Sequence, residues 1–145
     1  MIKIGVVCVG KIKEEFYRAA MDEYLKRLSR FAKVEVKEIS EGKNLEEEGA
    51  NILRAAKGKI IALCIEGKKF SSEELAGYVK SMCDGGEMFT FIIGSSHGLS
   101  EAVKRAAHLK LSFSDMTFPH QLMRVILAEQ LYRSFMINGG GEYHK

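Results

Sequence analysis

The residues best suited to chemistry lie at the end of the sequence. After three consecutive glycines the chain finishes with Tyr143, His144 and Lys145, although the ends of a chain are usually poorly ordered and tolerant of change. A phenol can stack on a ring or hydrogen-bond to it, an imidazole can move a proton near neutral pH, and an ammonium can contact a phosphate. This ending indicates a C-terminal segment that takes part in catalysis or binding.

Arg124 is a second candidate, because it interrupts the otherwise apolar residues 122–128. A cation in such a stretch must either face a cleft or find a partner. In a cleft it would hold the oxygens of a ligand bidentately. The alternative is a structural ion pair, for which Glu129 and Asp115 are candidate partners, and the sequence leaves both interpretations open.

Residues 94–98, Gly-Ser-Ser-His-Gly, match the G-x-S-x-G pattern of the α/β-hydrolase nucleophile elbow. Asp115 and then His120 or His144 follow in the order of a catalytic triad, so a serine hydrolase that uses Ser96 is an alternative function. The chain is short for that fold, and no second glycine-rich loop upstream supplies an oxyanion donor. A turn whose glycines allow positive φ explains the same residues.

Length and composition narrow the class of protein. With 145 residues, 46% hydrophobic and 28% charged, we expect one soluble globular domain over residues 1–145. No apolar run approaches the roughly 18 residues that span a bilayer, and the start lacks the features of a signal peptide. We therefore expect a cytoplasmic protein with no membrane segment.

Metal and nucleotide motifs are missing from the sequence. Cys8, Cys64 and Cys83 are isolated and the four histidines lack zinc spacing, so we expect no metal site and thiols that behave as small hydrophobes. Neither a Walker phosphate loop nor a dinucleotide-binding glycine pattern is present. The basic cluster Lys26, Arg27, Arg30, Lys33 and Lys37 could contact phosphates or form an ordinary solvated face.

Apolar runs alternate with helical patterns along the chain. Strands are predicted at residues 2–9, 34–39, 59–65, 88–93 and 109–113, and helices at 14–30, 45–56, 71–83, 100–107 and 119–137. This alternation predicts an α/β fold, a parallel sheet with helices on both faces. Ligands of open parallel sheets bind beyond the carboxyl ends of the strands, so we expect the site in the loops after Ile65, Ile93 and Phe113.

The last predicted helix is apolar almost all round, which indicates a second partner for it. Leu122 and Ile126 cannot face the same sheet as Val125 and Leu131. One side would cover the sheet and the other a second subunit, so we expect a homodimer. Burial of the whole helix within one chain is the alternative.

The sequence resembles the ribosomal RNA large subunit methyltransferase H family. The resemblance rests on FSDMTFPHQLMRVILAEQLYRSFMI at residues 113–137, on IIGSSHGLS at 92–100 and on the terminal YHK, and it extends over the whole chain. It implies a SPOUT-class enzyme with a C-terminal trefoil knot, which acts as a homodimer. The implied reaction is methylation of N3 of a pseudouridine in 23S ribosomal RNA, in the large subunit or the assembled ribosome, with S-adenosylmethionine (SAM) as methyl donor.

The resemblance also implies roles for single residues. SAM would contact one residue at the end of each of two strands and the loop before the last helix: Leu63, Gly94, Phe113, Ser114, Asp115, Met116, Thr117 and Phe118. Tyr143 and His144 match the terminal Tyr-His pair of the family. We expect His144 to act as general base or to bind the uracil edge, Tyr143 to stack on or hydrogen-bond the base, and Arg124 to hold a phosphate or a uracil oxygen.

Two departures from the family pattern and two alternatives remain. Ser95 stands where the family often has a second glycine, and Glu142 where it often has proline before Tyr-His. Tyr143 and His144 could instead only seal the dimer. The chain could also be a nucleotide-binding module without activity.

Overall fold

A computed structural model describes residues 1–143 of the chain. Five parallel strands form one sheet in the order β2-β1-β4-β3-β5. The strands are β1 (Ile2–Val9), β2 (Ala32–Ile39), β3 (Lys59–Lys69), β4 (Phe89–Ile93) and β5 (Leu109–Ser112). A helix follows each strand: α1 (Glu15–Leu28), α2 (Leu45–Ala55), α3 (Ser72–Asp84), α4 (Glu101–Ala106) and α5 (His120–Asn138). The predicted α/β fold is confirmed.

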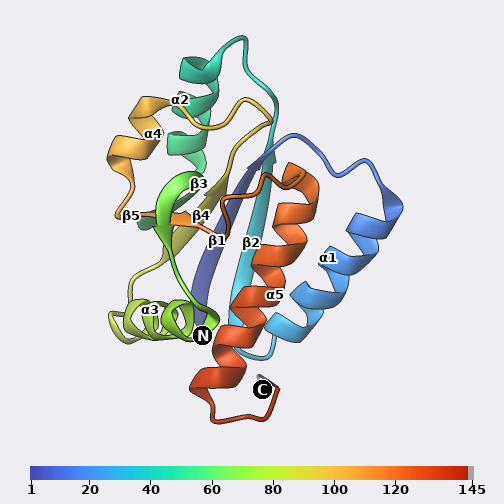
Figure 1. The fold of residues 1–145 in the computed structure, drawn as a ribbon, viewed down its shortest axis with the longest axis vertical. Coiled ribbons are helices and arrows are strands. Elements are labelled where there is room, and N and C mark those ends of the chain that lie inside the picture. Colours follow the sequence, from blue (N-terminus) through green and yellow to red (C-terminus); the bar gives the residue numbers. More distant parts are fainter. Residues whose placement is uncertain (144–145) are drawn as a thin grey trace.

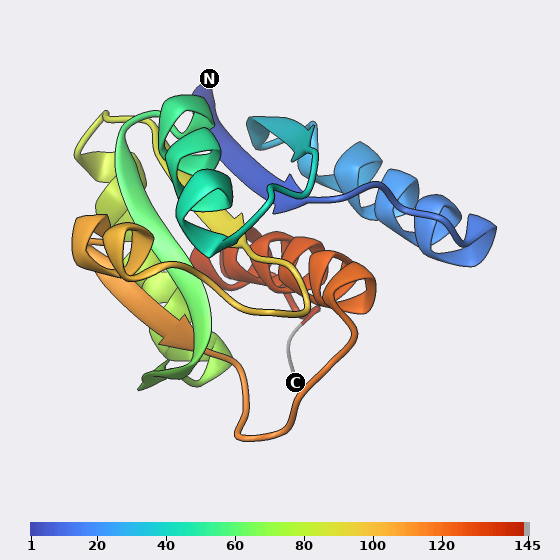
Figure 2. The ribbon, with the colours of Figure 1, turned by 90° about the horizontal axis from the view of Figure 1, so that it is seen from above.

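The helices cover both faces of the sheet (Figures 1 and 2). Helices α1, α3 and α5 lie on one face, where α5 packs between the other two, and α2 packs beside α4 on the opposite face. The side chains of β1 alternate between the two resulting cores. Ile4 and Val6 join the core under α5, whereas Val7 and Val9 join the core under α2 and α4, as the period of two in a strand requires.

The cysteine of the first strand belongs to the core under α5. Cys8 is fully buried, and burial raises the pKa of its thiol to about 11. Such a thiol stays protonated at neutral pH and behaves as a small hydrophobic side chain.

Strand β4 is buried over its whole length, as expected for a central parallel strand covered on both faces.

Strand β3 is longer than the sequence predicts. The expected loop after Ile65 is instead a continuation of the strand to Lys69. The pairing with β5 shifts there, since both Leu63 and Lys68 stand opposite Leu111. Such an irregularity inserts extra residues and bends the strand. The correction has a physical reason: Glu66, Lys68 and Lys69 are charged and exposed and residue 67 is a glycine, so the extension has no apolar strand pattern.

Local sequence sets where the helices begin. Ser71 and Glu74 form the predicted capping box of α3, and the Ser100 side chain caps α4. Pro119 stands immediately before α5, where its fixed φ suits the entry into a helix. None of the described helices is long and apolar enough to cross a membrane. The trefoil knot stays a prediction from the resemblance.

Candidate functional site

A cavity of about 230 Å³ lies beside residues 63–66 of β3 and at the carboxyl ends of β4 and β5. It is the region in which an open parallel sheet binds its ligands. Seven of the eight residues predicted to contact the cofactor line it, although they come from three separate parts of the sequence: Leu63, Gly94, Phe113, Ser114, Met116, Thr117 and Phe118. The structure therefore brings together residues that the sequence could only assign one by one.

Gly94 directly follows β4, at a point where the neighbouring backbone leaves no room for a side chain. A Cβ atom on Gly94 would lie 2.5 Å from the carbonyl oxygen of Gly98 and 2.8 Å from Leu99. The turn closes with a hydrogen bond of 2.9 Å from the Gly98 N–H to the Ser95 carbonyl oxygen. The departure at Ser95 is accommodated, because its buried hydroxyl accepts a hydrogen bond from the His97 N–H.

The loop between β5 and α5 forms a second wall of the cavity. The Ser114 hydroxyl accepts a hydrogen bond from the Met116 N–H, and the Ser112 hydroxyl donates one to the Ser114 carbonyl oxygen. Asp115 is the one predicted cofactor residue that does not line the cavity. Its exposed carboxylate pairs with Lys69 on the extension of β3, so it holds the loop to the strand.

Most of the cavity wall is apolar, and its charge is confined to one place. Leu63, Ile93 and Phe113 belong to the apolar part. Among the described lining residues only Glu66, on β3, and Lys104, on α4, carry a formal charge, and their charged atoms lie 2.6 Å apart. The wall thus offers an apolar surface for a ring and one ion pair for charged groups.

Arg124 does not line the cavity, and it forms a structural ion pair with a partner that the sequence did not indicate. Its side chain is 1% exposed, and its Nη1 donates a hydrogen bond of 2.6 Å to the Glu38 carboxylate at the end of β2. Its Nη2 donates to the carbonyl oxygens of Val9 and Gly10. An ion pair is present, but its partner is neither Glu129 nor Asp115. The prediction of a substrate contact is corrected for this chain, because the guanidinium is already enclosed.

Tyr143, the last described residue, packs on the far half of α5. The Tyr143 hydroxyl donates a hydrogen bond of 2.7 Å to Glu129, and the same carboxylate pairs with Arg133 at 2.8 Å. The Arg133 guanidinium lies 4.8 Å from the centre of the Tyr143 ring. The rings of Tyr132 and Tyr143 pack edge to face. The hydrogen bond to Glu129 is the main cause of a raised Tyr143 pKa. His144 lies outside the described residues.

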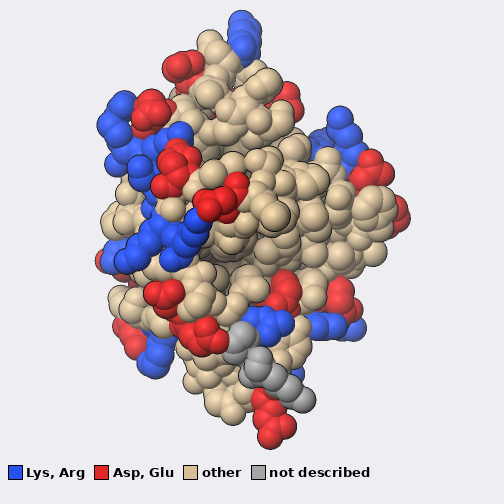
Figure 3. All heavy atoms as spheres, in the orientation of Figure 1, with Lys and Arg blue, Asp and Glu red and all other residues tan. Residues whose placement is uncertain are grey.

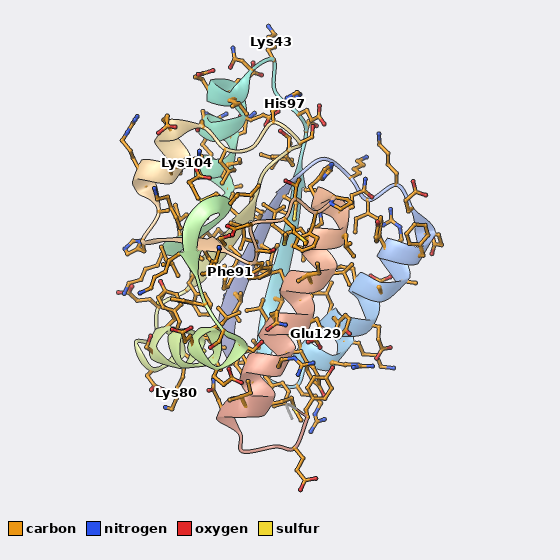
Figure 4. The ribbon with its side chains drawn as sticks, in the orientation of Figure 1. Lys43, Lys80, Phe91, His97, Lys104 and Glu129 are labelled. Atoms are coloured by element: carbon orange, nitrogen blue, oxygen red, sulfur yellow. The ribbon has the colours of Figure 1, made fainter. Side chains whose placement is uncertain are left out.

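Within one chain, Tyr143 does not reach the cavity. The cavity touches α5 only at His120 and Met123. Glu129 is six residues further along the helix, about 9 Å at 1.5 Å per residue, and Figure 4 shows it far from Lys104. Sequence reasoning missed the cluster of Glu129, Arg133 and Tyr143. The spacing of four between the first two residues was the available signal.

Comparison with known proteins decides the family. A family model described as "Predicted SPOUT methyltransferase" matches residues 2–144. A ribosomal RNA large subunit methyltransferase H of Oenococcus oeni is 46% identical over 160 aligned positions that cover 100% of both chains. A protein of the same name from Bifidobacterium animalis subsp. lactis is 47% identical and covers 99% of this chain and 100% of its own. The chain belongs to the ribosomal RNA large subunit methyltransferase H family. It is a methyltransferase, as the resemblance implied.

A solved structure supports the fold of this methyltransferase. A probable methylase family protein from Haemophilus influenzae Rd KW20 aligns with a TM-score of 0.55 and covers 94% of this chain and 66% of its own. Sequence identity between the two is 11%, so the likeness concerns the fold alone. It places this methyltransferase among proteins with the same parallel arrangement.

The alternative of a serine hydrolase finds no geometry in the described part of the methyltransferase. Ser96 is exposed and forms no hydrogen bond with Asp115 or His120. No described residue other than glycine has a positive φ, whereas a nucleophile elbow is a sharp, strained turn. The glycines and serines of residues 94–98 therefore serve the turn that shapes the cavity.

His120 is a lining residue that sequence reasoning did not assign to the cofactor site. Burial, followed by the nearby Arg124, lowers the pKa of its imidazole. The ring is therefore neutral at physiological pH, and its buried Nδ1 has no hydrogen-bond partner among the described residues. A neutral ring at this wall is compatible with a positively charged ligand.

Residues 1–143 contain no group of three His, Cys, Asp or Glu side chains placed to hold a metal.

Proposed function

We propose that this enzyme transfers the methyl group of SAM to N3 of a pseudouridine in 23S ribosomal RNA, with the cofactor bound in the cavity at the ends of β3, β4 and β5. The observation that carries the proposal is the convergence of seven predicted cofactor residues on this one cavity. Its apolar wall suits the adenine ring, and Gly94 allows a ligand to approach the backbone closely. Family membership supplies the reaction class.

The protein's task in this reaction is mainly to position the acceptor. SAM supplies a methyl group that is already activated on a sulfonium, so no further activation of the donor is needed. N3 of the pseudouridine carries a proton that must leave, and a histidine suits this step because it titrates near neutral pH. We assign the proton transfer, or a contact with the uracil edge, to His144 and the stacking or hydrogen bonding of the base to Tyr143.

The distance between Tyr143 and the cavity supports a homodimer with a shared site. In one chain Tyr143 contacts the far half of α5, so the partner's C-terminal residues would complete each cavity. Helix α5 keeps Leu122, Val125 and Ile126 partly exposed, and Figure 3 shows mostly uncharged side chains over its first half. An uncharged surface of this kind suits contact with a second copy of the chain.

Further features follow from the same proposal. Arg124 acts by positioning: it ties the start of α5 to the ends of β1 and β2, and thereby holds the loop that forms the cavity wall. Residues 1–145 act as one domain.

The substrate of the enzyme is ribosomal RNA in the large subunit or the assembled ribosome, so we place the enzyme in the cytoplasm.

Methyl transfer from labelled SAM to ribosomes that lack the modification tests the function. The wild-type protein should label the 23S RNA at one pseudouridine, and His144→Ala should lower the rate by about a hundredfold, the typical contribution of a positioned acid or base. Tyr143→Phe, which keeps the ring, should lose less. SAM binding by both variants should stay close to that of the wild type. A His144→Ala protein that methylates at the wild-type rate would remove His144 from the mechanism.

A further inference from the structure

The ion pair of Lys104 and Glu66 lies in the cavity wall, between α4 and β3. Lys104 comes from α4 and Glu66 from the extension of β3, and their charged atoms meet at 2.6 Å. Lys104 also lies 4.0 Å from Glu101, which is outside the wall. Surface ion pairs of this kind contribute little to stability. Their position among apolar lining residues therefore points to a ligand.

The ligand of this cavity has one end whose chemistry matches the pair. SAM carries an adenine ring, a ribose and an α-amino acid, and only the amino acid combines a carboxylate with an ammonium. Among the described lining residues, Lys104 is the only cation and Glu66 the only anion. Since charged groups need partners when they leave water, the amino-acid end finds complementary charges only here.

The environment of the pair keeps both groups charged and accessible. The hydrogen bond with Lys104 lowers the pKa of Glu66, and the same contact raises the pKa of Lys104. The Lys104 side chain is 22% exposed and that of Glu66 is 51% exposed. Partial removal from water strengthens charge interactions, while the remaining exposure lets a ligand reach both groups. Figure 4 shows Lys104 on α4, beside β3.

We propose that Lys104 and Glu66 form the subsite for the α-amino-acid end of SAM, in which the Lys104 ammonium binds the carboxylate and the Glu66 carboxylate binds the ammonium. On binding, the two side chains exchange their mutual ion pair for two pairs with the ligand. The apolar part of the wall then receives the adenine ring. This inference rests on the cofactor site proposed above and identifies which of its residues select an amino-acid-bearing nucleoside.

Two ligands that differ only in the amino-acid end test the subsite. S-adenosylhomocysteine contains this end, whereas 5′-methylthioadenosine shares the adenosine and the thioether but lacks it. Calorimetric titration of Lys104→Met should show the Kd for S-adenosylhomocysteine raised about tenfold, equivalent to about 1.4 kcal/mol, and the Kd for 5′-methylthioadenosine changed less than twofold. Glu66→Gln should act in the same direction. Unchanged binding of 5′-methylthioadenosine also shows that each variant is folded.

Lys110→Met provides the matched control. Lys110 lies close enough to lower the pKa of Glu66 but does not line the cavity, so its loss should leave both Kd values within twofold. Equal weakening of both ligands by Lys104→Met, or weakening of neither, would overturn the subsite. The same wild-type preparation is also assayed for methylation of ribosomes. If it methylates them while the subsite test fails, only the subsite is wrong; if it does not methylate them, the proposed function is wrong.

Discussion

Gly94 shows how a single residue shapes the cavity that we propose as the cofactor site. Its backbone lies so close to Gly98 that a methyl group would stand 2.5 Å from a carbonyl oxygen. Gly94→Ala must therefore displace the turn that follows β4. We expect the Kd for S-adenosylhomocysteine to rise at least tenfold and the free energy of unfolding to fall by about 1–3 kcal/mol. Calorimetric titration and urea denaturation measure the two effects.

Gly77 supplies the control for this substitution. It lies inside α3, and a Cβ atom there would have no neighbour within 4 Å. Gly77→Ala should raise stability by up to about 1 kcal/mol, the difference in helix propensity between the two residues, and leave cofactor affinity unchanged. Comparable losses of affinity in both variants would show that Gly94 has no special role.

Leu63 and Gly94, two of the residues predicted to contact the cofactor, both line the cavity. Leu63 lies in β3 and Gly94 directly follows β4, and parallel strands direct their carboxyl ends to one edge of the sheet. The roles of Asp115 and Arg124 could not be predicted, because their partners Lys69 and Glu38 lie 46 and 86 residues away in sequence. Neither distance leaves a periodic signal.

At the scale of elements, the pair of Arg124 and Glu38 joins α5 to the ends of β1 and β2. Arg124→Met would remove the side-chain donor of the Glu38 carboxylate and of the Gly10 carbonyl oxygen. The Glu38 side chain is 31% exposed and keeps a hydrogen bond from the Ile12 N–H, so we expect the free energy of unfolding to fall by about 1–3 kcal/mol, the cost of lost buried hydrogen bonds. Urea denaturation followed by circular dichroism measures the loss.

An exposed pair in another helix serves as comparison. Lys80 and Asp84 in α3 are more than half exposed, so Lys80→Met should change stability by no more than about 0.5 kcal/mol. If Arg124→Met proved as mild as Lys80→Met, the positioning role of Arg124 would be wrong.

The extension of β3 marks the limit of sequence patterns for elements. Apolar alternation identifies strands that are buried, and it identified the positions of all five strands of the sheet. Lys68 and Lys69 pair with β5, the edge strand of the sheet, and their charged side chains remain in solvent. Backbone pairing of this kind does not depend on side-chain polarity, so no apolar pattern in the sequence indicates it.

At the scale of the whole molecule, a shared site predicts complementation between two inactive variants. Gly94→Ala damages the cavity, whereas truncation after Ile137 removes the C-terminal residues but keeps the cavity. In a purified heterodimer of the two variants, the truncated chain supplies the intact cavity. The Gly94→Ala chain supplies the intact C-terminal residues, called the tail below. We expect about half the wild-type methylation per dimer if the tail acts on the partner's cavity.

Each homodimer of these variants serves as a control and should be inactive on ribosomes. A heterodimer without activity would show that cavity and tail must belong to the same chain. Analytical ultracentrifugation of the wild-type protein should give the mass of two chains, and a monomer under the assay conditions would contradict the shared site.

The position of the cavity in the sequence also determines when the enzyme becomes competent during its own synthesis. Residues 109–138 supply the edge strand, one wall of the cavity and the helix packed between α1 and α3. They follow the rest of the sheet during synthesis, because ribosomes build chains from the N-terminus. A growing chain therefore lacks the complete cavity, and with it the proposed cofactor site, until these residues have been made.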